Sequence, residues 1–186
     1  MTDTNPDKVH VMHDIETLAL ESNIPVLLSL GAVKFTRQHI VESFHVRFDI
    51  ADCQRNGLVI EAATVDWWMD EERAEARRQL RSMGQVDLYS GLDGYRQWIS
   101  ETPTDLLGSA WSQGSSFDNA RLEAIYARVG IEWPFGYRQI ECYRTMRNRF
   151  ADVQFRRIGV HHGALDDAHS QAAHLIQIVQ AHGISL

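Results

Sequence analysis

The feature that most constrains the fold is a set of three strand-like segments in the N-terminal quarter of the chain. These segments are rich in β-branched and apolar residues and span 9–16, 29–35 and 41–48. The third alternates apolar and polar positions, which is typical of a half-buried strand. Because residues 36–39 form only a short link, we expect the second and third strands to be an antiparallel hairpin. The pattern predicts an N-terminal meander of three strands.

The rest of the chain alternates helix-like and strand-like patterns. Helical patterns cover 64–81, 94–100, 117–129 and 165–180, and strand-like patterns cover 106–111 and 138–143. The pattern over 117–129 has apolar residues at helical spacing and is followed by Gly130, a residue type that commonly ends a helix. A meander followed by such alternation predicts an α/β fold, with a central mixed five-stranded sheet flanked by helices.

The length of 186 residues suits a single domain, which we place at 9–186 after a flexible tail at 1–8. No apolar run approaches the ~18 residues that span a bilayer, so we expect no membrane partner. The N-terminus lacks the apolar stretch of a secretory signal. Cys53 and Cys142 form no CxxC pair, which suits a reducing cytoplasm better than a disulfide framework.

The chain is acidic, with 18 basic and 25 acidic residues and a net charge of −7. Nucleic-acid binding normally uses a basic surface, so this charge alone argues against it. An acidic protein can still act on phosphates if its carboxylates hold metal ions, because the ions reverse the local sign of charge. Metal binding of this kind requires several of the acids to lie close together.

Three acids occupy positions that favour a cluster. Asp14 and Glu16 lie two residues apart near the end of the first predicted strand, so they point to the same face. Neighbouring carboxylates repel each other unless one is protonated or a cation lies between them. Asp118 opens the helix predicted over 117–129. A solvated strand end and an ordinary helix cap would also explain these residues, so neither motif establishes a site alone.

The last predicted helix begins with a histidine and two acids. His162 precedes Asp167 by five residues, and His161 precedes Asp166 by the same number. At ~100° per residue, Asp166 points almost opposite the apolar stripe of the helix, whereas Asp167 lies nearer its edge. This geometry favours Asp167 as the acid that approaches the sheet.

Together, the four acids and the histidine predict a metal-dependent hydrolytic site. Two divalent cations need several carboxylates at one point, with positions open for water and substrate oxygens. Hard oxygen ligands favour Mg²⁺ or Mn²⁺ over Zn²⁺. A histidine side chain, whose ordinary pKa is about 6.5, can deprotonate a water molecule at neutral pH.

The same residues resemble the motifs of the DEDDh exonucleases, which are 3′–5′ exonucleases with a ribonuclease H-like fold. The matching segments read DIET at 14–17, FDN at 117–119 and HGALDDA at 162–168. The segment ATVDWWMDEERAEAR at 63–77 is also similar to the Thr-x-x-Trp-Trp segment of phage-type exonuclease A and of related small bacterial 3′–5′ exoribonucleases. The resemblance implies a bacterial or phage-encoded nuclease.

The resemblance also implies a role for each matching residue. Asp14 would bridge two ions of Mg²⁺ or Mn²⁺, Glu16 and Asp167 would hold the first ion, and Asp118 would support the second. His162 would be the general base for the water that attacks the terminal phosphodiester at the 3′ end of single-stranded DNA or RNA. The product would be a nucleoside 5′-monophosphate.

The resemblance also implies three residues that contact the substrate: Thr17, Asn119 and Leu18. The Leu18 side chain would wedge against the last base. His13 departs from the family pattern, which usually has an apolar residue before the first aspartate. It would either perturb metal affinity or point away from the site.

Two other features have both a functional and a structural interpretation. Trp67 and Trp68 would stack on bases, or one would lie in the core and the other at an edge. The arginine-rich stretch at 144–157 would hold phosphates or form a solvated helix face.

Other functions remain open at this point. A catalytically silent module on the same fold would bind nucleic acid or a protein partner, but it would not need the repelling acids. A mononuclear zinc hydrolase would use His161, His162 and Asp167, although no third histidine lies nearby. The sequence does not separate DNA from RNA. Homodimers occur among small relatives, but the chain has no interface signature.

Overall fold

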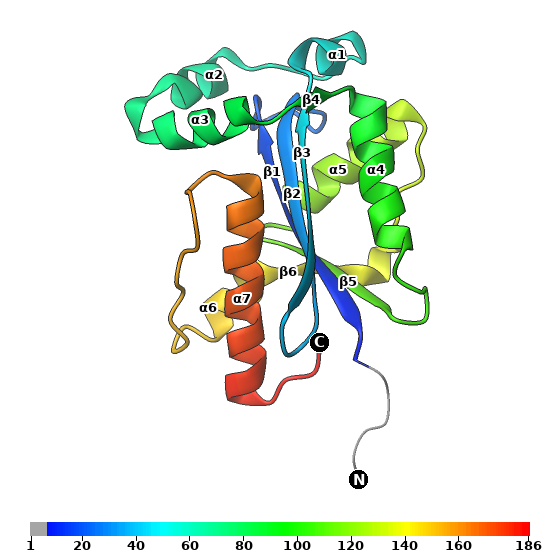
Figure 1. Cartoon of the computed structure of the whole chain (residues 1–186), viewed down its shortest axis with the longest axis vertical. Helices are drawn as coiled ribbons and strands as arrows, with labels where there is room; N and C mark the ends of the chain where they lie inside the picture. The colour runs from blue at the N-terminus through cyan, green and yellow to red at the C-terminus, as the bar shows by residue number, and fades with distance from the viewer. Residues whose placement is uncertain (1–6) are drawn as a thin grey trace.

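The computed structural model describes residues 7–186 and has a mixed β-sheet with helices on both faces (Figure 1). The strands are β1 (Val9–Thr17), β2 (Leu27–Phe35), β3 (Ile40–Phe48), β4 (Gln85–Val86), β5 (Leu107–Ser112) and β6 (Ile140–Cys142). The α-helices are α1 (Ile50–Arg55), α2 (Ala62–Met69), α3 (Ala74–Ser82), α4 (Leu88–Ser100), α5 (Asp118–Val129), α6 (Tyr143–Arg149) and α7 (Ala164–His182). Most of the tail predicted at 1–8 lies outside the described residues.

The sheet confirms the expected meander and the α/β class. Its order is β4-β3-β2-β1-β5-β6, with β2 antiparallel to both β1 and β3, and β5 parallel to β1. The count of five strands is wrong, because the sheet has six. The additional strand, β4, is two residues long and pairs with Arg47 and Phe48 of β3. Two residues are too few to produce a periodic pattern that the sequence could reveal.

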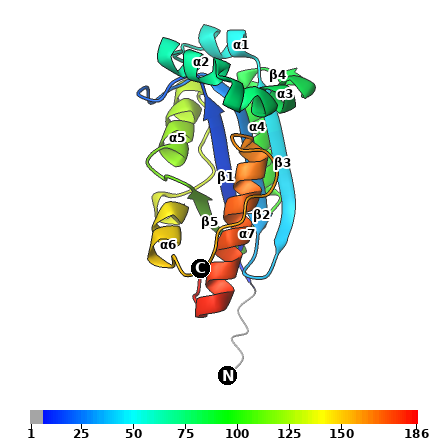
Figure 2. The same ribbon diagram turned by 90° about the vertical axis from the view of Figure 1, so that its left-hand side faces the viewer.

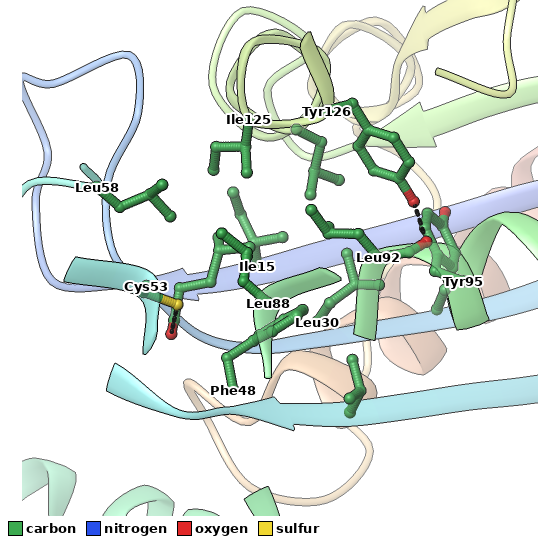
Figure 3. Close-up of a cluster of buried hydrophobic side chains, with 14 of the residues drawn as sticks. Ile15, Leu30, Phe48, Cys53, Leu58, Leu88, Leu92, Tyr95, Ile125 and Tyr126 are labelled. Carbon is green, nitrogen blue, oxygen red and sulfur yellow. Dashed lines mark hydrogen bonds between the residues drawn. The ribbon is translucent and has the colours of Figure 1, made fainter. Parts of the chain in front are cut away.

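Helices cover the sheet unequally. Helix α7 packs along β1, β2 and β3 on one face, and α4 and α5 pack on the other (Figures 1 and 2). The larger apolar core lies under α4 and α5 and includes Ile15, Leu30 and Phe48 (Figure 3). In this core the Tyr126 hydroxyl donates to the Leu92 carbonyl at 2.6 Å, which satisfies a buried polar group.

Side-chain alternation along β1 assigns its acids to one face. Val11 and Ile15 belong to the core under α4 and α5, whereas Met12 belongs to the smaller core under α7. Because side chains alternate with a period of two, Asp14 and Glu16 share the α7 face with Met12.

A glycine in β2 lets α7 come close to this face. Gly31 lies opposite Asp14 in the antiparallel register. A Cβ atom at Gly31 would lie only 2.1 Å from the backbone nitrogen of Leu165 in the first turn of α7. The absence of a side chain therefore allows the start of α7 to pack directly on the strand pair that carries the acids.

The single helix predicted over 64–81 is wrong, because the structure has two helices there. Asp70 interrupts the segment with an extended backbone, and its side chain accepts the Glu72 N–H at 3.0 Å. The resulting hairpin, α2–α3, lies over the end of β1 and the start of α7 (Figure 1). Gln79 of α3 donates to Asp166 at 3.0 Å, which ties the hairpin to α7.

The chain ends lie away from this region. The first residues of β1 and the C-terminal residue Leu186 are both near the opposite end of α7 from its N-terminus (Figure 1). Leu186 packs against the smaller core. Between residues 7 and 186, none of the helices is both long enough and apolar enough to cross a membrane.

Candidate active site

A cavity of 340 Å³ lies where β1 ends and α7 begins. The elements around it are far apart in the sequence but meet because α7 packs along β1 while α5 starts beside the same strand. The cavity is lined by all five residues predicted to be catalytic: Asp14, Glu16, Asp118, His162 and Asp167.

The two β1 acids lie side by side with little solvent around them. Burial, together with the charges of Asp118 and Asp167, raises the pKa of Asp14 well above its ordinary value. Glu16 is 8% exposed, and burial followed by the charge of Asp14 raises its pKa well above the ordinary value. Gln171 of α7 donates to Asp14 Oδ1 at 2.9 Å and partly opposes the rise. The cluster therefore favours the binding of protons or cations, which neutralise its negative charges.

Asp118 reaches the same cavity from the first position of α5. Its carboxylate accepts the Ile15 N–H at 3.4 Å, which links α5 to β1 between the two strand acids. Burial raises the pKa of Asp118 to about 6, while the backbone N–H groups that bond to it act in the opposite direction.

The two aspartates at the start of α7 have different environments. Asp167 is 8% exposed, accepts the His162 N–H at 3.0 Å and forms an ion pair with Arg157. Asp166 does not line the cavity. It accepts the Val160 N–H at 2.8 Å and thereby holds the loop before the helix. This arrangement is the one that the helical phase predicts.

His162 stands in a strained and crowded position above the acids. Its backbone φ is +64°, a region that residues other than glycine rarely adopt. Its ring centre lies 3.8 Å from that of His161 and 4.9 Å from that of Trp67. Burial, and then the nearby His161, lowers the pKa of His162 to about 4, against the opposing effect of Asp167. The imidazole is therefore neutral at pH 7 and able to accept a proton.

The donor atoms are compatible with a hard divalent cation. Ligand atoms of Glu16, His162 and Asp167 all lie within 4.8 Å of one another. The side-chain oxygen of Gln171, beside Asp14, is buried without a partner among the described residues. Oxygen-rich donors of this kind suit Mg²⁺ or Mn²⁺.

Of the three residues predicted to contact the substrate, one lines a cavity beside the acids and two do not. Thr17 lines a second cavity of 240 Å³ that adjoins the first. Leu18 does not line it: its side chain is 8% exposed and belongs to the large core. Leu20, which is 55% exposed, lines the second cavity instead. Asn119 is buried, donates to Ser112 Oγ at 2.9 Å and lines neither cavity.

Leu18 lies in the core and not in the second cavity because β1 is irregular just before it. The register of β1 against β2 shifts between Glu16 and Thr17. Side-chain alternation is broken at such a bulge, so residues after it cannot be assigned to a face by counting.

The structure also places the tryptophan pair, Trp67 and Trp68, and the unusual His13. Trp68 is 5% exposed and donates to the Thr17 carbonyl at 2.9 Å, whereas Trp67 is 38% exposed; both line the second cavity. One tryptophan therefore packs in the core and the other lies at the edge. His13 points away from the acids and contacts the Tyr95 hydroxyl at 2.9 Å in the opposite core.

Sequence reasoning missed two residues, one that lines the cavity and one that supports the loop beside it. Gln171 lies one helical turn beyond Asp167, and that spacing is the signal that could have placed it on the cavity side of α7. Glu61 accepts three backbone N–H groups, from Leu20, Glu21 and Ser22, and so fixes the loop after β1. No local pattern marks Glu61, because its partners lie about 40 residues earlier.

Residues 9–179 match the model of a family described as "3'-5' exoribonuclease Rv2179c-like domain". No curated protein matches the chain. The nuclease domain of 3'hExo, described as a DEDDh family member bound to rAMP, has a TM-score of 0.67 and 14% identity, over 95% of this chain and 94% of that one. E. coli exonuclease I in complex with a dT13 oligonucleotide has a TM-score of 0.65 and 12% identity, over 92% and 41%. These structural similarities establish a shared fold.

Proposed function

We propose a specific reaction for this chain, which belongs to the family of Rv2179c-like 3′–5′ exoribonuclease domains. Membership makes the chain a 3′–5′ exonuclease of the DEDDh type, as the sequence motifs predict, and therefore a phosphodiester hydrolase. We infer that residues 9–186 act as one domain on the 3′ end of single-stranded RNA and release nucleoside 5′-monophosphates. The family description favours RNA over DNA.

The observation that carries this proposal is the convergence of Asp14, Glu16, Asp118 and Asp167 on one cavity. Buried like charges are costly, and the raised pKa values of Asp14 and Glu16 express that cost. A module that only binds nucleic acid has no need to maintain such repulsion. The convergence therefore favours an enzyme over the silent module.

The enzyme type depends on divalent metal ions, and we propose two ions of Mg²⁺ or Mn²⁺. Asp14, Glu16 and Asp167 would hold the first, and Asp118 the second, with Asp14 shared. When bound, the ions would supply charge stabilisation for the attacking and leaving oxygens of the scissile phosphodiester.

His162 would take the proton from the attacking water. Its neutral imidazole has a free electron pair at pH 7, and the left-handed backbone together with the flanking rings of His161 and Trp67 orients it over the acids. Asp167 would fix the loop that carries His162 by accepting its backbone N–H. The terminal nucleoside would occupy the second cavity beside Thr17 and Leu20.

The test is digestion of matched single-stranded RNA and DNA, labelled at either end, with product lengths followed over time in Mg²⁺, Mn²⁺ or Zn²⁺. We expect stepwise shortening from the 3′ end of RNA, with 5′-mononucleotides as products. Asp14→Asn should abolish cleavage while leaving the circular dichroism spectrum unchanged. Asp105→Asn, which alters an exposed carboxylate outside the cavity, is the matched control.

Three outcomes would contradict the proposal. Full turnover by Asp14→Asn would show that Asp14 is not needed for catalysis. Metal-independent RNA binding with no mononucleotide released would favour the silent module. Activity with Zn²⁺ alone would support the mononuclear zinc hydrolase.

A further inference from the structure

The catalytic cavity also has basic side chains in its lining. Arg144, Arg147 and Arg157 line it together with the acids. The Arg144 guanidinium lies beside Gly114, where a Cβ atom would come within 3.6 Å of it. Arg157 forms an ion pair with Asp167, but Arg144 and Arg147 form no ion pair with any residue of the range 7–186. Two cationic side chains without acidic partners are therefore available for an anion.

A third cavity, with a volume of 510 Å³, lies beside Arg147. Arg147 and Phe155 line both cavities, so the two spaces adjoin at these side chains. The guanidinium carbon of Arg147 lies 5.1 Å from the centre of the Phe155 ring, and that of Arg157 lies 5.7 Å from it. An aromatic ring beside guanidinium groups can stack on a nucleobase while the guanidinium groups neutralise nearby phosphates.

The positions of the cavities give the strand a direction. The second cavity adjoins the first at Glu16 and His162, and its lining contains no arginine, whereas the third adjoins the first at Arg147 and Phe155. A terminal nucleoside has no further chain beyond it, so a small aromatic cavity suffices. The rest of the strand bears a phosphate at every nucleotide and must leave through a side that offers cations.

We propose that Arg144, Arg147 and Phe155 form a binding site for the single strand on the 5′ side of the scissile bond. The two arginines contact backbone phosphates, and Phe155 stacks on an unpaired base. This inference rests on the proposed exonuclease function. It explains how a chain with a net charge of −7 holds a polyanion: the cations are few and are concentrated along the path of the strand.

The structure divides the arginine-rich stretch into members of this site and bystanders. Arg149 and Arg156 belong to the same stretch and are also exposed, but they line none of the three cavities. Replacing either one changes the net charge by the same amount as replacing Arg147. Arg149→Gln is therefore a matched control for Arg147→Gln.

The experiment compares two substrates in steady-state kinetics. One is a single-stranded RNA oligonucleotide. The other is the p-nitrophenyl ester of a nucleoside 5′-monophosphate, which has a scissile phosphodiester but no upstream nucleotide. For Arg147→Gln we expect the KM for RNA to rise about tenfold, the size of a lost charge-assisted hydrogen bond. The ratio of kcat/KM for RNA to that for the ester should fall by a similar factor, and Arg147→Lys should recover part of it.

The salt dependence of the reaction distinguishes the contribution of the Arg147 charge from that of the Phe155 ring. For RNA, the slope of log(kcat/KM) against log[salt] should become about 0.7 less steep in Arg147→Gln, as expected when one single-strand phosphate contact is lost. In Phe155→Leu the KM for RNA should rise while the slope stays as in the wild type.

Equal effects of Arg147→Gln and Arg149→Gln, or equal effects of Arg147→Gln on both substrates, would overturn this inference alone. A wild-type enzyme that cleaves neither substrate would overturn the proposed function itself.

Discussion

His162, the proposed general base, shows how neighbouring groups set the properties of one side chain. Its backbone has a left-handed conformation, its ring packs against those of His161 and Trp67, and burial lowers its pKa. His161 has the same chemistry and lines the same cavity, but no ligand atom of it belongs to the group formed by Glu16, His162 and Asp167. We expect the two histidines to differ sharply in function.

His162→Ala should lower kcat by about 10²–10⁴-fold, the usual contribution of a general base. His161→Ala should lower it far less, because that ring only packs against the base. Both variants are to be compared by initial rates on labelled RNA at saturating substrate. A larger loss in His161→Ala would mean that the wrong histidine has been assigned as the base.

At this scale, the sequence predicts what depends on regular geometry. The choice of Asp167 over Asp166 follows from helical phase, and the pairing of Asp14 with Glu16 follows from strand alternation. Leu18 could not be placed, because the shift after Glu16 ends that alternation and depends on the pairing of β1 with β2. The pairing of Arg157 with Asp167 also depends on tertiary packing.

Among the secondary-structure elements, the contact of α7 with β2 has the largest consequence for the site. Gly31→Ala would place a methyl group 2.1 Å from the Leu165 nitrogen, so the start of α7 must move away from the strand pair. A displacement of about 1 Å at a reacting centre costs about 10²-fold in rate. We expect kcat to fall by about that factor and the free energy of unfolding to fall by about 1–3 kcal/mol, as for other overpacked positions.

Gly94→Ala is the control for this substitution. The nearest atom to a Cβ at Gly94, the Phe44 Cζ atom, is 4.0 Å away, so alanine fits without displacement. Chemical denaturation and initial rates on RNA measure both effects. Wild-type kcat in a correctly folded Gly31→Ala protein would show that the close approach of α7 is unimportant for catalysis.

The element boundaries that sequence analysis missed have a common cause. The break between α2 and α3 depends on one side chain, Asp70, that caps the following turn within an otherwise helical pattern. Strand β4 exists only because Gln85 and Val86 find partners on β3. Single caps and tertiary pairing leave no periodic signal, whereas the meander and α7 repeat their apolar pattern over many residues.

Over the whole molecule, the acid cluster links stability to pH and to metal. Asp118 has a folded-state pKa of about 6, above its ordinary value of 3.8. Between these values the folded state binds more protons than the unfolded state, so this group makes the free energy of unfolding decrease as pH rises. His10 and His13, whose pKa values are lowered to about 4 and about 3, act in the opposite direction.

The contribution of Asp118 is measured as the difference in free energy of unfolding between a variant and the wild type. In EDTA, the free energy of unfolding of Asp118→Asn minus that of the wild type should increase from pH 4 to pH 6 and then level off. The increase should be no more than a few kcal/mol, at about 1.4 kcal/mol per pKa unit. Saturating Mn²⁺ should stabilise the wild type more at pH 7 than at pH 5, because protons compete with the ion. A difference that is independent of pH would contradict the raised pKa.

The positions of the chain ends have a practical consequence. The start of β1 and Leu186 both lie near the end of α7 that is opposite its N-terminus (Figure 1), whereas the cavity lies at the N-terminal end of α7. A linker attached at either place would therefore start away from the cavity. The protein should therefore keep its activity when it is immobilised on a support or fused to a partner through a linker placed before β1 or after Leu186.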